Sequence, residues 1–207
     1  MILKKMSLGP LGTNCYILIQ DQETLIVDPG GDADQVIAYL DKENLKPLAI
    51  LLTHAHFDHI GGVDDLRQHY QIDVYGHEAE NEWLSSARLN GSYMFTGETI
   101  ETTPPEKLLD PGHITLGGFD FDVLHTPGHS PGSVSFVFHD RALIIGGDVL
   151  FNGGIGRTDL PGGDFQTLES SIKERFYTLP DHFEVYPGHG PKTTIDAEKR
   201  GNPFVMG

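Results

Sequence analysis

Cysteine is almost missing from this chain. Cys15 is the single cysteine among 207 residues, which excludes an intrachain disulfide and a cysteine-rich zinc site. Because Cys15 lies in an apolar stretch, NCYILI, we predict a buried strand residue and not a nucleophile. A chain without disulfides fits a reducing compartment, so we expect a cytoplasmic location.

Basic residues are also scarce. The chain has 14 Lys and Arg against 30 Asp and Glu, which gives a formal net charge of −16. Proteins that bind nucleic acid need a cationic track, because most of the affinity is electrostatic. A nucleic-acid partner is therefore not expected.

Long hydrophobic runs are lacking as well. No stretch of about 18 apolar residues occurs, and no charged-then-apolar leader precedes Leu3. We therefore predict a protein without a membrane partner. With 38% hydrophobic residues, the chain can bury the core of one compact domain, predicted to span residues 1–207.

The most informative segment is HAHFDH at residues 54–59, which holds three imidazoles and a carboxylate. It follows the apolar run 48–52, predicted to be a buried strand, and precedes a helical pattern that begins near Ile60. In an extended segment His54 and His56 project to the same side, whereas Asp58 and His59 lie past the turn. The spacing therefore predicts ligands for two adjacent cations.

Further ligands are expected at three other strand ends. His129 lies in a Gly- and Pro-rich turn, Asp148 follows an apolar strand that ends at 146–147, and His189 follows the predicted strand 183–186. Flanking glycines let the backbone turn sharply and approach an ion. Asp148 taken alone also fits a helix cap or a turn residue. Isolated histidines elsewhere are expected to be surface or satisfied core residues: His69, His77, His113, His125, His139 and His182.

In this order and at these separations, the residues resemble the five signature motifs of the metallo-β-lactamase superfamily. Within it, the chain is most similar to the short, single-domain bacterial members of the glyoxalase II-like hydrolases. The strings that indicate this subgroup are GGIGRTDLPGGD at 153–164, PGHGPKTT at 187–194, and Asn202-Pro203-Phe204. The resemblance runs from GPLGTNCYIL near the start to the last of these strings.

The resemblance implies a binuclear metal site with a defined ligand set. One metal would be bound by His54, His56 and His129; a second would be bound by Asp58, His59 and His189; and Asp148 would bridge them. Zinc is favoured for imidazole-rich sites without a redox task, although iron and manganese also accept such donors. The oxygen-reducing di-iron branch of the superfamily has Glu where this chain has His56, which disfavours that branch.

The resemblance also implies the reaction, which is hydrolysis of a small acyl thioester by a hydroxide held between two divalent cations. No Ser or Cys nucleophile is then needed, and Asp58 is the residue expected to orient the hydroxide or move its proton. Two alternatives stay open. One is a mononuclear iron persulfide dioxygenase that uses His54, His129 and Asp148. The other is a hydrolase of lactones or small esters, or a metal-binding module with little turnover.

The substrate is expected to be a small-molecule thioester that is bound weakly through its thiol part. Full-length glyoxalase II enzymes have a C-terminal helical domain whose basic residues hold glutathione, and here only residues 190–207 follow His189. We therefore expect that domain to be missing. Arg157 and Lys192 are predicted substrate contacts, with solvated surface charges as the alternative for each.

Along the chain, the expected elements form two similar halves joined by a long middle segment, 77–110, predicted to cover the substrate as a flap. The first half has strands at 2–7, 14–20, 23–28, 48–52 and 72–75, and helices at 33–44 and 58–70. The second has strands at 113–117, 119–125, 133–138, 142–147 and 183–186, and a helix at 165–178. The fold class that the resemblance implies is an α+β four-layer αββα sandwich, with two mixed β-sheets flanked by helices.

Overall fold

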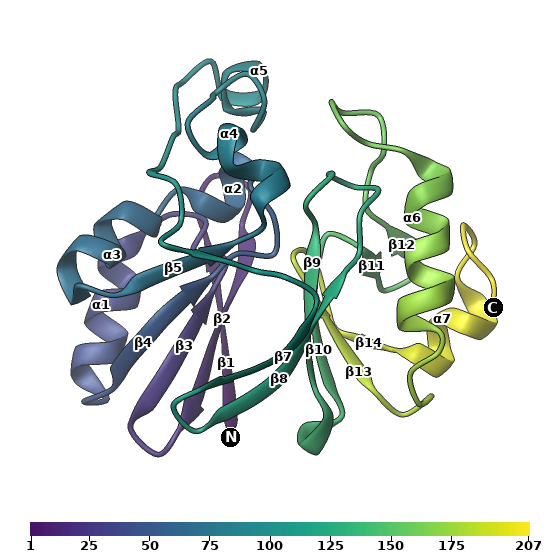
Figure 1. The fold of residues 1–207 in the computed structure, drawn as a ribbon, viewed down its shortest axis with the longest axis horizontal. Helices are drawn as coiled ribbons and strands as arrows, with labels where there is room; N and C mark the ends of the chain where they lie inside the picture. Colours follow the sequence, from purple (N-terminus) through teal and green to yellow (C-terminus); the bar gives the residue numbers. More distant parts are fainter. The chain divides into compact units, whose positions relative to one another are not determined.

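The computed structural model describes all of residues 1–207, and the chain divides into two compact units. The first unit comprises Met1–Leu109 and Thr115–Phe119, and the second comprises Asp110–Ile114 and Asp120–Gly207. The fold contains two six-stranded sheets and one small two-stranded sheet (Figure 1). None of its helices has the length and apolar character needed to cross a membrane.

The first sheet is mixed. Its strand order is β1-β2-β3-β4-β5-β6, with antiparallel pairing up to β3 and parallel pairing from β3 to β6. The strands are β1 Ile2–Leu8, β2 Thr13–Gln20, β3 Glu23–Val27, β4 Lys46–Leu51, β5 Asp73–Gly76 and β6 Lys107–Leu108. Parallel neighbours need crossover connections, and helices α1 (Ala33–Lys42) and α3 (Val63–Tyr70) provide the first two.

These helices pack on the sheet through one apolar face each. Val36 and Leu40 of α1 and Val63 and Leu66 of α3 are buried in one core cluster. Strand residues Ile17, Ile26 and Ile50 belong to the same cluster. Burial of this apolar area is the main stabilising term for the unit, and it fixes β4, whose end leads into the HAHFDH segment.

The second sheet is also mixed, with the order β14-β13-β10-β9-β8-β7. Its strands are β7 Gly112–Leu116, β8 Phe119–His125, β9 Val134–Phe138, β10 Leu143–Gly147, β13 Glu184–Pro187 and β14 Thr193–Thr194. Strand β10 pairs in parallel with β13 and antiparallel with β9. The two-stranded sheet is a hairpin of β11 (Leu150–Phe151) and β12 (Gly154–Ile155).

Helices cover one side of the second core. Helix α6 (Phe165–Ser171) continues as a π-helical turn, Ile172–Phe176, and α7 is Ile195–Gly201. Their apolar residues share one buried cluster with the sheet, among them Leu168, Ile172, Phe176, Ile195, Ile144 and Val185.

The predicted helix at 58–70 is in fact two helices. α2 (Phe57–Ile60) ends before α3 begins, and Gly61 and Gly62 separate them. A Cβ on Gly61 would lie 2.6 Å from the carbonyl oxygen of Gly30. The backbone of the loop after β3 therefore packs directly against this break, a tertiary contact that a helical periodicity does not reveal.

The middle segment, 77–110, contains little helix. The polar stretch EAENEWLSSARL forms only the 3₁₀ turn η1 (Glu78–Glu80) and helix α4 (Asn81–Leu84), and α5 follows at Ser92–Thr96. A short 3₁₀ turn, η2 (His139–Arg141), joins β9 to β10. In Figure 1, α2, α4 and α5 lie together at one end of the first sheet, and the N-terminus lies at the opposite end.

Candidate metal centre

The first set of predicted ligands lies where β4 ends. After Leu51 the chain continues outside helix and strand to His56, which is the N-terminal cap residue of α2 and has an extended backbone with φ −66° and ψ 145°. Asp58 and His59 occupy the first turn of that helix. All four predicted ligands of this segment are buried, so a single short segment brings three imidazoles and a carboxylate into the interior of the first unit.

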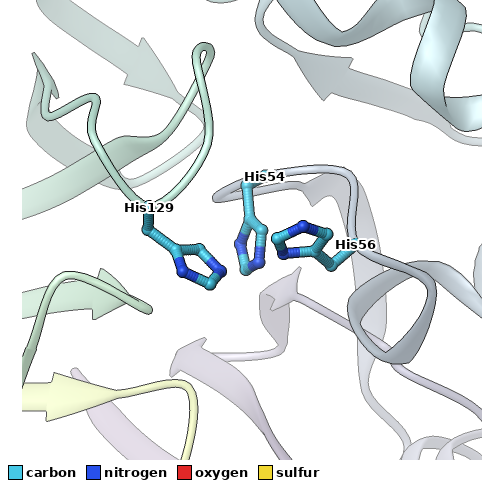
Figure 2. A group of neighbouring side chains, drawn as sticks. All are labelled: His54, His56 and His129. Atoms are coloured by element: carbon cyan, nitrogen blue, oxygen red, sulfur yellow. The ribbon is translucent and has the colours of Figure 1, made fainter. Parts of the chain in front are cut away.

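The four side chains form one cluster. The ring of His54 lies 4.9 Å from that of His56 and 4.1 Å from that of His59, measured between centroids. Nε2 of His59 lies 3.6 Å from Oδ2 of Asp58. Figure 2 shows His54 and His56 side by side on their loop. Two ligand atoms bonded to one zinc ion at about 2.0–2.1 Å in tetrahedral geometry lie about 3.4 Å apart, so the separation of the ligand atoms of His59 and Asp58 suits a shared cation.

Asp28 contacts one imidazole directly and a second through the hydroxyl of Thr53. Its Oδ2 lies 3.0 Å from Nδ1 of His59 and accepts a hydrogen bond from the Thr53 hydroxyl at 2.6 Å, and its Oδ1 accepts one from the Thr53 amide at 2.8 Å. The same hydroxyl lies 3.0 Å from Nδ1 of His54. A carboxylate at one ring nitrogen fixes the tautomer and presents the other nitrogen to a metal.

Asp28 and Thr53 were missed by the sequence analysis. The signal for Asp28 was present, because it follows an apolar strand, β3, and precedes Pro29-Gly30. The same pattern, an aspartate directly after an apolar strand and close to glycine, led to the prediction of Asp148 as a ligand. The backbone of Asp28 has φ +50°, a left-handed conformation that Asp tolerates better than most residues.

Two more residues that the sequence analysis missed support the segment. The Thr13 hydroxyl, at the start of β2, donates a hydrogen bond to Oδ2 of Asp58 at 2.7 Å. The amide of Ala55 donates to Oε2 of Glu80 at 2.5 Å, and both Thr13 and Glu80 are buried. No local sequence pattern connects either residue to the segment, because both are brought there by the tertiary fold.

The second set of predicted ligands lies in the second unit, at three strand ends. His129 is in the turn between β8 and β9, Asp148 directly follows β10, and His189 follows β13. Oδ2 of Asp148 lies 3.6 Å from Nε2 of His129 and also 3.6 Å from Nε2 of His189. Since β10 and β13 are parallel neighbours, their ends meet at one edge of the sheet. Asp148 thus lies between two imidazoles, and its role as a bridging ligand stays a prediction.

The loop after β12 fixes the orientation of His129. Nδ1 of His129 lies 2.8 Å from the carbonyl oxygen of Arg157, to which it donates, so Nε2 is directed to Asp148. Gly156 lets this loop come close, because a Cβ there would lie 1.9 Å from the carbonyl oxygen of Asp148 and 3.1 Å from Nδ1 of His129. The GGIGRTD string therefore has a structural role beside two predicted metal ligands.

The two predicted substrate contacts pair with acidic neighbours. The guanidinium of Arg157 donates two hydrogen bonds of 2.8 Å to Asp159, which raise the pKa of Arg157 and lower that of Asp159 to about 2. The ammonium of Lys192 bonds to Glu184 and lies 5.5 Å from the centre of the Tyr186 ring. Their role in substrate binding stays a prediction.

Cys15 and three of the isolated histidines have the structural roles predicted for them. Cys15 is fully buried, and burial raises the pKa of its thiol, which makes it a poor nucleophile. His113 and His139 both bond to Asp122, and Nε2 of His125 lies 3.0 Å from the carbonyl oxygen of Pro131.

The stretch that contains all seven predicted ligands has a match among known families. Residues 8–189 match the metallo-beta-lactamase superfamily. The chain belongs to this superfamily. The resemblance read from its motifs is therefore confirmed.

Relatives within the superfamily cover nearly the whole chain. The probable metallo-hydrolase YqgX of Bacillus subtilis is 49% identical over 205 residues, which are 99% of this chain and 97% of that protein. Hydroxyacylglutathione hydrolase GloC of Haemophilus influenzae is 39% identical over 195 residues, 93% of this chain and 92% of that protein.

Solved structures match the superfamily fold equally well. The crystal structure of the BLEG-1 B3 metallo-beta-lactamase is 51% identical, covers 100% of both chains and has a TM-score of 0.97. That of TTHA1623 in a di-iron-bound form is 41% identical, covers 98% of this chain and 100% of that one, and has a TM-score of 0.89. The predicted fold class, the metallo-beta-lactamase fold with two mixed sheets flanked by helices, is confirmed.

Proposed function

We propose that this metallo-beta-lactamase superfamily protein is a binuclear metal-dependent hydrolase of small acyl thioesters. One relative supports metal-dependent hydrolysis, and another supports a thioester substrate. The Bacillus subtilis relative is named as a probable metallo-hydrolase, and the Haemophilus influenzae relative is named as a hydroxyacylglutathione hydrolase, which acts on a thioester.

The proposed ligand sets are those the sequence indicates. One metal would be held by His54, His56 and His129; the other would be held by Asp58, His59 and His189; and Asp148 would be shared by both. One observation carries this proposal. In each unit the predicted ligands lie together. In the first unit, the ring of His54 lies 4.9 Å from that of His56 and 4.1 Å from that of His59, and in the second unit Oδ2 of Asp148 lies 3.6 Å from Nε2 of both His129 and His189.

The donor set fits divalent cations of intermediate hardness. It consists of imidazoles and carboxylates without thiolates, and the Nδ1 atoms of His54, His59 and His129 are all held by oxygen partners. We propose zinc, because hydrolysis needs no redox change. Iron is the alternative, which the di-iron-bound form of TTHA1623 supports.

The chemistry assigns a separate task to Asp58. Two divalent cations bound by these residues would lower the pKa of a water molecule and polarise the substrate carbonyl. The Thr13 hydroxyl holds Oδ2 of Asp58 at 2.7 Å, so the carboxylate is oriented to direct the attacking water and to accept its proton. A thiolate leaves readily without strong acid assistance, and the products are a carboxylate and a thiol.

A second candidate is hydrolysis of a β-lactam. It is favoured by the match to the BLEG-1 B3 metallo-beta-lactamase. The amide carbonyl of a β-lactam would be attacked by the same nucleophile, but its leaving group is an amine, which needs a proton that a thiolate does not. Apart from the proposed ligands, no side chain near Asp58 is assigned to donate a proton to the amine. We therefore prefer the thioester as the substrate.

The test is a substrate panel with the metal-loaded protein. S-lactoylglutathione, a simple acyl thioester, a lactone and a β-lactam are compared by kcat/KM. We expect the thioesters to be the best substrates, and the proposal is wrong if no thioester is turned over while the lactone or β-lactam is. Oxygen uptake with a persulfide tests the dioxygenase alternative in the same preparation.

Two variants accompany the panel. Asp58→Ala should lower thioester turnover by orders of magnitude with a small change in melting temperature, because it removes a ligand and proton acceptor but little core packing. Asp65→Ala, an exposed aspartate in α3, is the matched control and should retain wild-type turnover. Retention of most of the rate in Asp58→Ala would exclude the role given to it.

A further inference from the structure

Three neighbouring apolar side chains are exposed on α5. Tyr93, Met94 and Phe95 have 67%, 61% and 44% of their surface accessible, respectively. No charged residue occurs between Leu89 and Gly97, in a chain whose formal net charge is −16. Contiguous exposed apolar side chains are typical of surfaces that bind a ligand or a partner. We call these three residues the apolar tip.

The base of the segment that bears the apolar tip is buried and ordered by hydrogen bonds. The Asn90 amide group donates to the carbonyl oxygen of Ile100 at 2.7 Å, and its Oδ1 accepts from the amide of Ser92 at 2.9 Å. The amide of Ile100 donates to the Ser92 hydroxyl at 3.1 Å. Because Asn90 and Ser92 are buried, the exposure of the tip is a property of a defined conformation and not of a loose loop.

The apolar tip is attached to the metal-ligand segment. The amide of Phe57 donates to the carbonyl oxygen of Asn90 at 3.1 Å. The rings of Phe57 and Phe95 stack, with centroids 6.0 Å apart and planes at 23°. Phe57 is buried and lies between His56 and Asp58 in the sequence. The apolar tip therefore contacts Phe57, the residue between two proposed metal ligands in the sequence.

We propose that the apolar tip binds an uncharged, apolar arm of the thioester substrate and so makes the enzyme prefer longer acyl or thiol chains. This inference rests on the proposed function. Aromatic rings supply rigid apolar area, and the flexible thioether of Met94 adapts to ligands of different shape. The neutral character of the segment fits an arm without charge.

The size of the apolar tip favours a substrate arm over a second protein chain. A stable interface buries about 800 Å² on each partner and takes about 20–30 residues a side, whereas the tip has three exposed side chains. Its contact with Phe57 places it next to two proposed metal ligands, His56 and Asp58. A second copy of the chain is kept as an outcome of the test.

The experiment compares chain-length series in the metal-loaded protein. One series lengthens the acyl chain of a thioester from two to eight carbons, and the other lengthens the thiol chain with the acyl group fixed. In the wild type, kcat/KM should rise by about two- to fourfold for each added methylene in one series. That series identifies which arm contacts the tip.

Met94→Ser should flatten that rise, so the ratio of kcat/KM for the longest and shortest substrates falls at least about tenfold, since several methylenes lose apolar contact. Ile2→Ser is the matched control, because Ile2 is 67% exposed and belongs to β1, at the opposite end of the same sheet from α5 (Figure 1). It should keep the wild-type ratio. Met94 is chosen because Phe95 also packs on Phe57, and its loss could disturb the ligand segment.

A binding measurement separates this inference from the proposed function. Titration calorimetry with S-octyl and S-ethyl thioether analogues should show tighter binding of the octyl compound in the wild type and a smaller difference in Met94→Ser. Equal slopes in wild type and Met94→Ser, or self-association that is lost in Met94→Ser, would overturn the inference while thioester turnover upholds the proposed function. If no thioester is turned over, the proposed function fails and the calorimetry alone decides on the tip.

Discussion

Nδ1 of His59 lies 3.0 Å from Oδ2 of Asp28, and both side chains are buried. The same carboxylate accepts two hydrogen bonds from Thr53, whose hydroxyl contacts His54. One aspartate therefore orients two imidazoles that are proposed to bind different metal ions. It does so without being a proposed ligand itself.

Replacement of Asp28 should weaken metal binding. Partners of this kind typically contribute 10- to 100-fold in metal affinity, so we expect Asp28→Asn to bind zinc about 10- to 100-fold more weakly, measured by competition with a chromophoric chelator. Asp32→Asn is the control, because Asp32 is also in the loop after β3 but accepts a hydrogen bond from the exposed amide of Gly9. Equal affinities of wild type and Asp28→Asn would remove Asp28 from the account.

Gly156 should be intolerant of any side chain. A Cβ there would lie 1.9 Å from the carbonyl oxygen of Asp148, so Gly156→Ala must move the backbone of a proposed ligand. We expect overpacking of this kind to lower the free energy of unfolding by about 1–3 kcal/mol in denaturant titrations. Gly201→Ala in α7, where no atom lies within 4 Å of the new Cβ, should be neutral or slightly stabilising. If the two variants are equally stable, the close approach does not exist in solution.

The pair of Arg157 and Asp159 predicts a pH effect with a definite sign. Hydrogen bonds from Arg157 lower the pKa of Asp159 from 3.8 to about 2. Because the folded value is below the unfolded one, the pair stabilises the fold above about pH 3.8, and this contribution is lost as the pH falls towards 2. The pair is exposed, so the effect on stability is small, and the pKa itself is the better observable.

The pKa of Asp159 is measured by NMR titration of its carboxyl carbon. Arg157→Gln should return the pKa of Asp159 towards 3.8, whereas Asp164, whose pKa is lowered by Thr167, should not change. A saturating anionic thioether analogue should raise the pKa of Asp159 if Arg157 turns to the substrate. An unchanged value in Arg157→Gln would show that the pair is open in solution.

Local sequence sufficed to predict which candidate ligands lie together in the first unit and where most of the strands lie. His54, His56, Asp58 and His59 lie in six consecutive residues at a strand end, so their grouping depends on local geometry. The strands β1, β2, β3 and β8 were predicted within one residue of their observed ends, because their apolar residues are continuous or alternate. The assignment of the ligands to two metal ions stays a prediction.

Features that depend on distant segments were missed. The break between α2 and α3 is set by Gly30, about thirty residues earlier in the chain, and the hydrogen bonds of Thr13 and Glu80 to the ligand segment bridge similar separations. The strands β11, β12 and β14 have two residues each, too few for any periodicity to appear. Helix α7 was missed, although Thr194 caps it by accepting from the amide of Ala197.

The most direct test of the account is the metal content of the purified protein, measured by elemental analysis together with the protein concentration and repeated after reconstitution with zinc. Seven donors exceed what one cation uses, since zinc in proteins takes about four or five ligands. The account predicts close to two divalent metal ions per chain, mainly zinc, with the second site emptied first in Asp58→Ala. A single tightly held iron per chain, with no second ion after reconstitution, would contradict it.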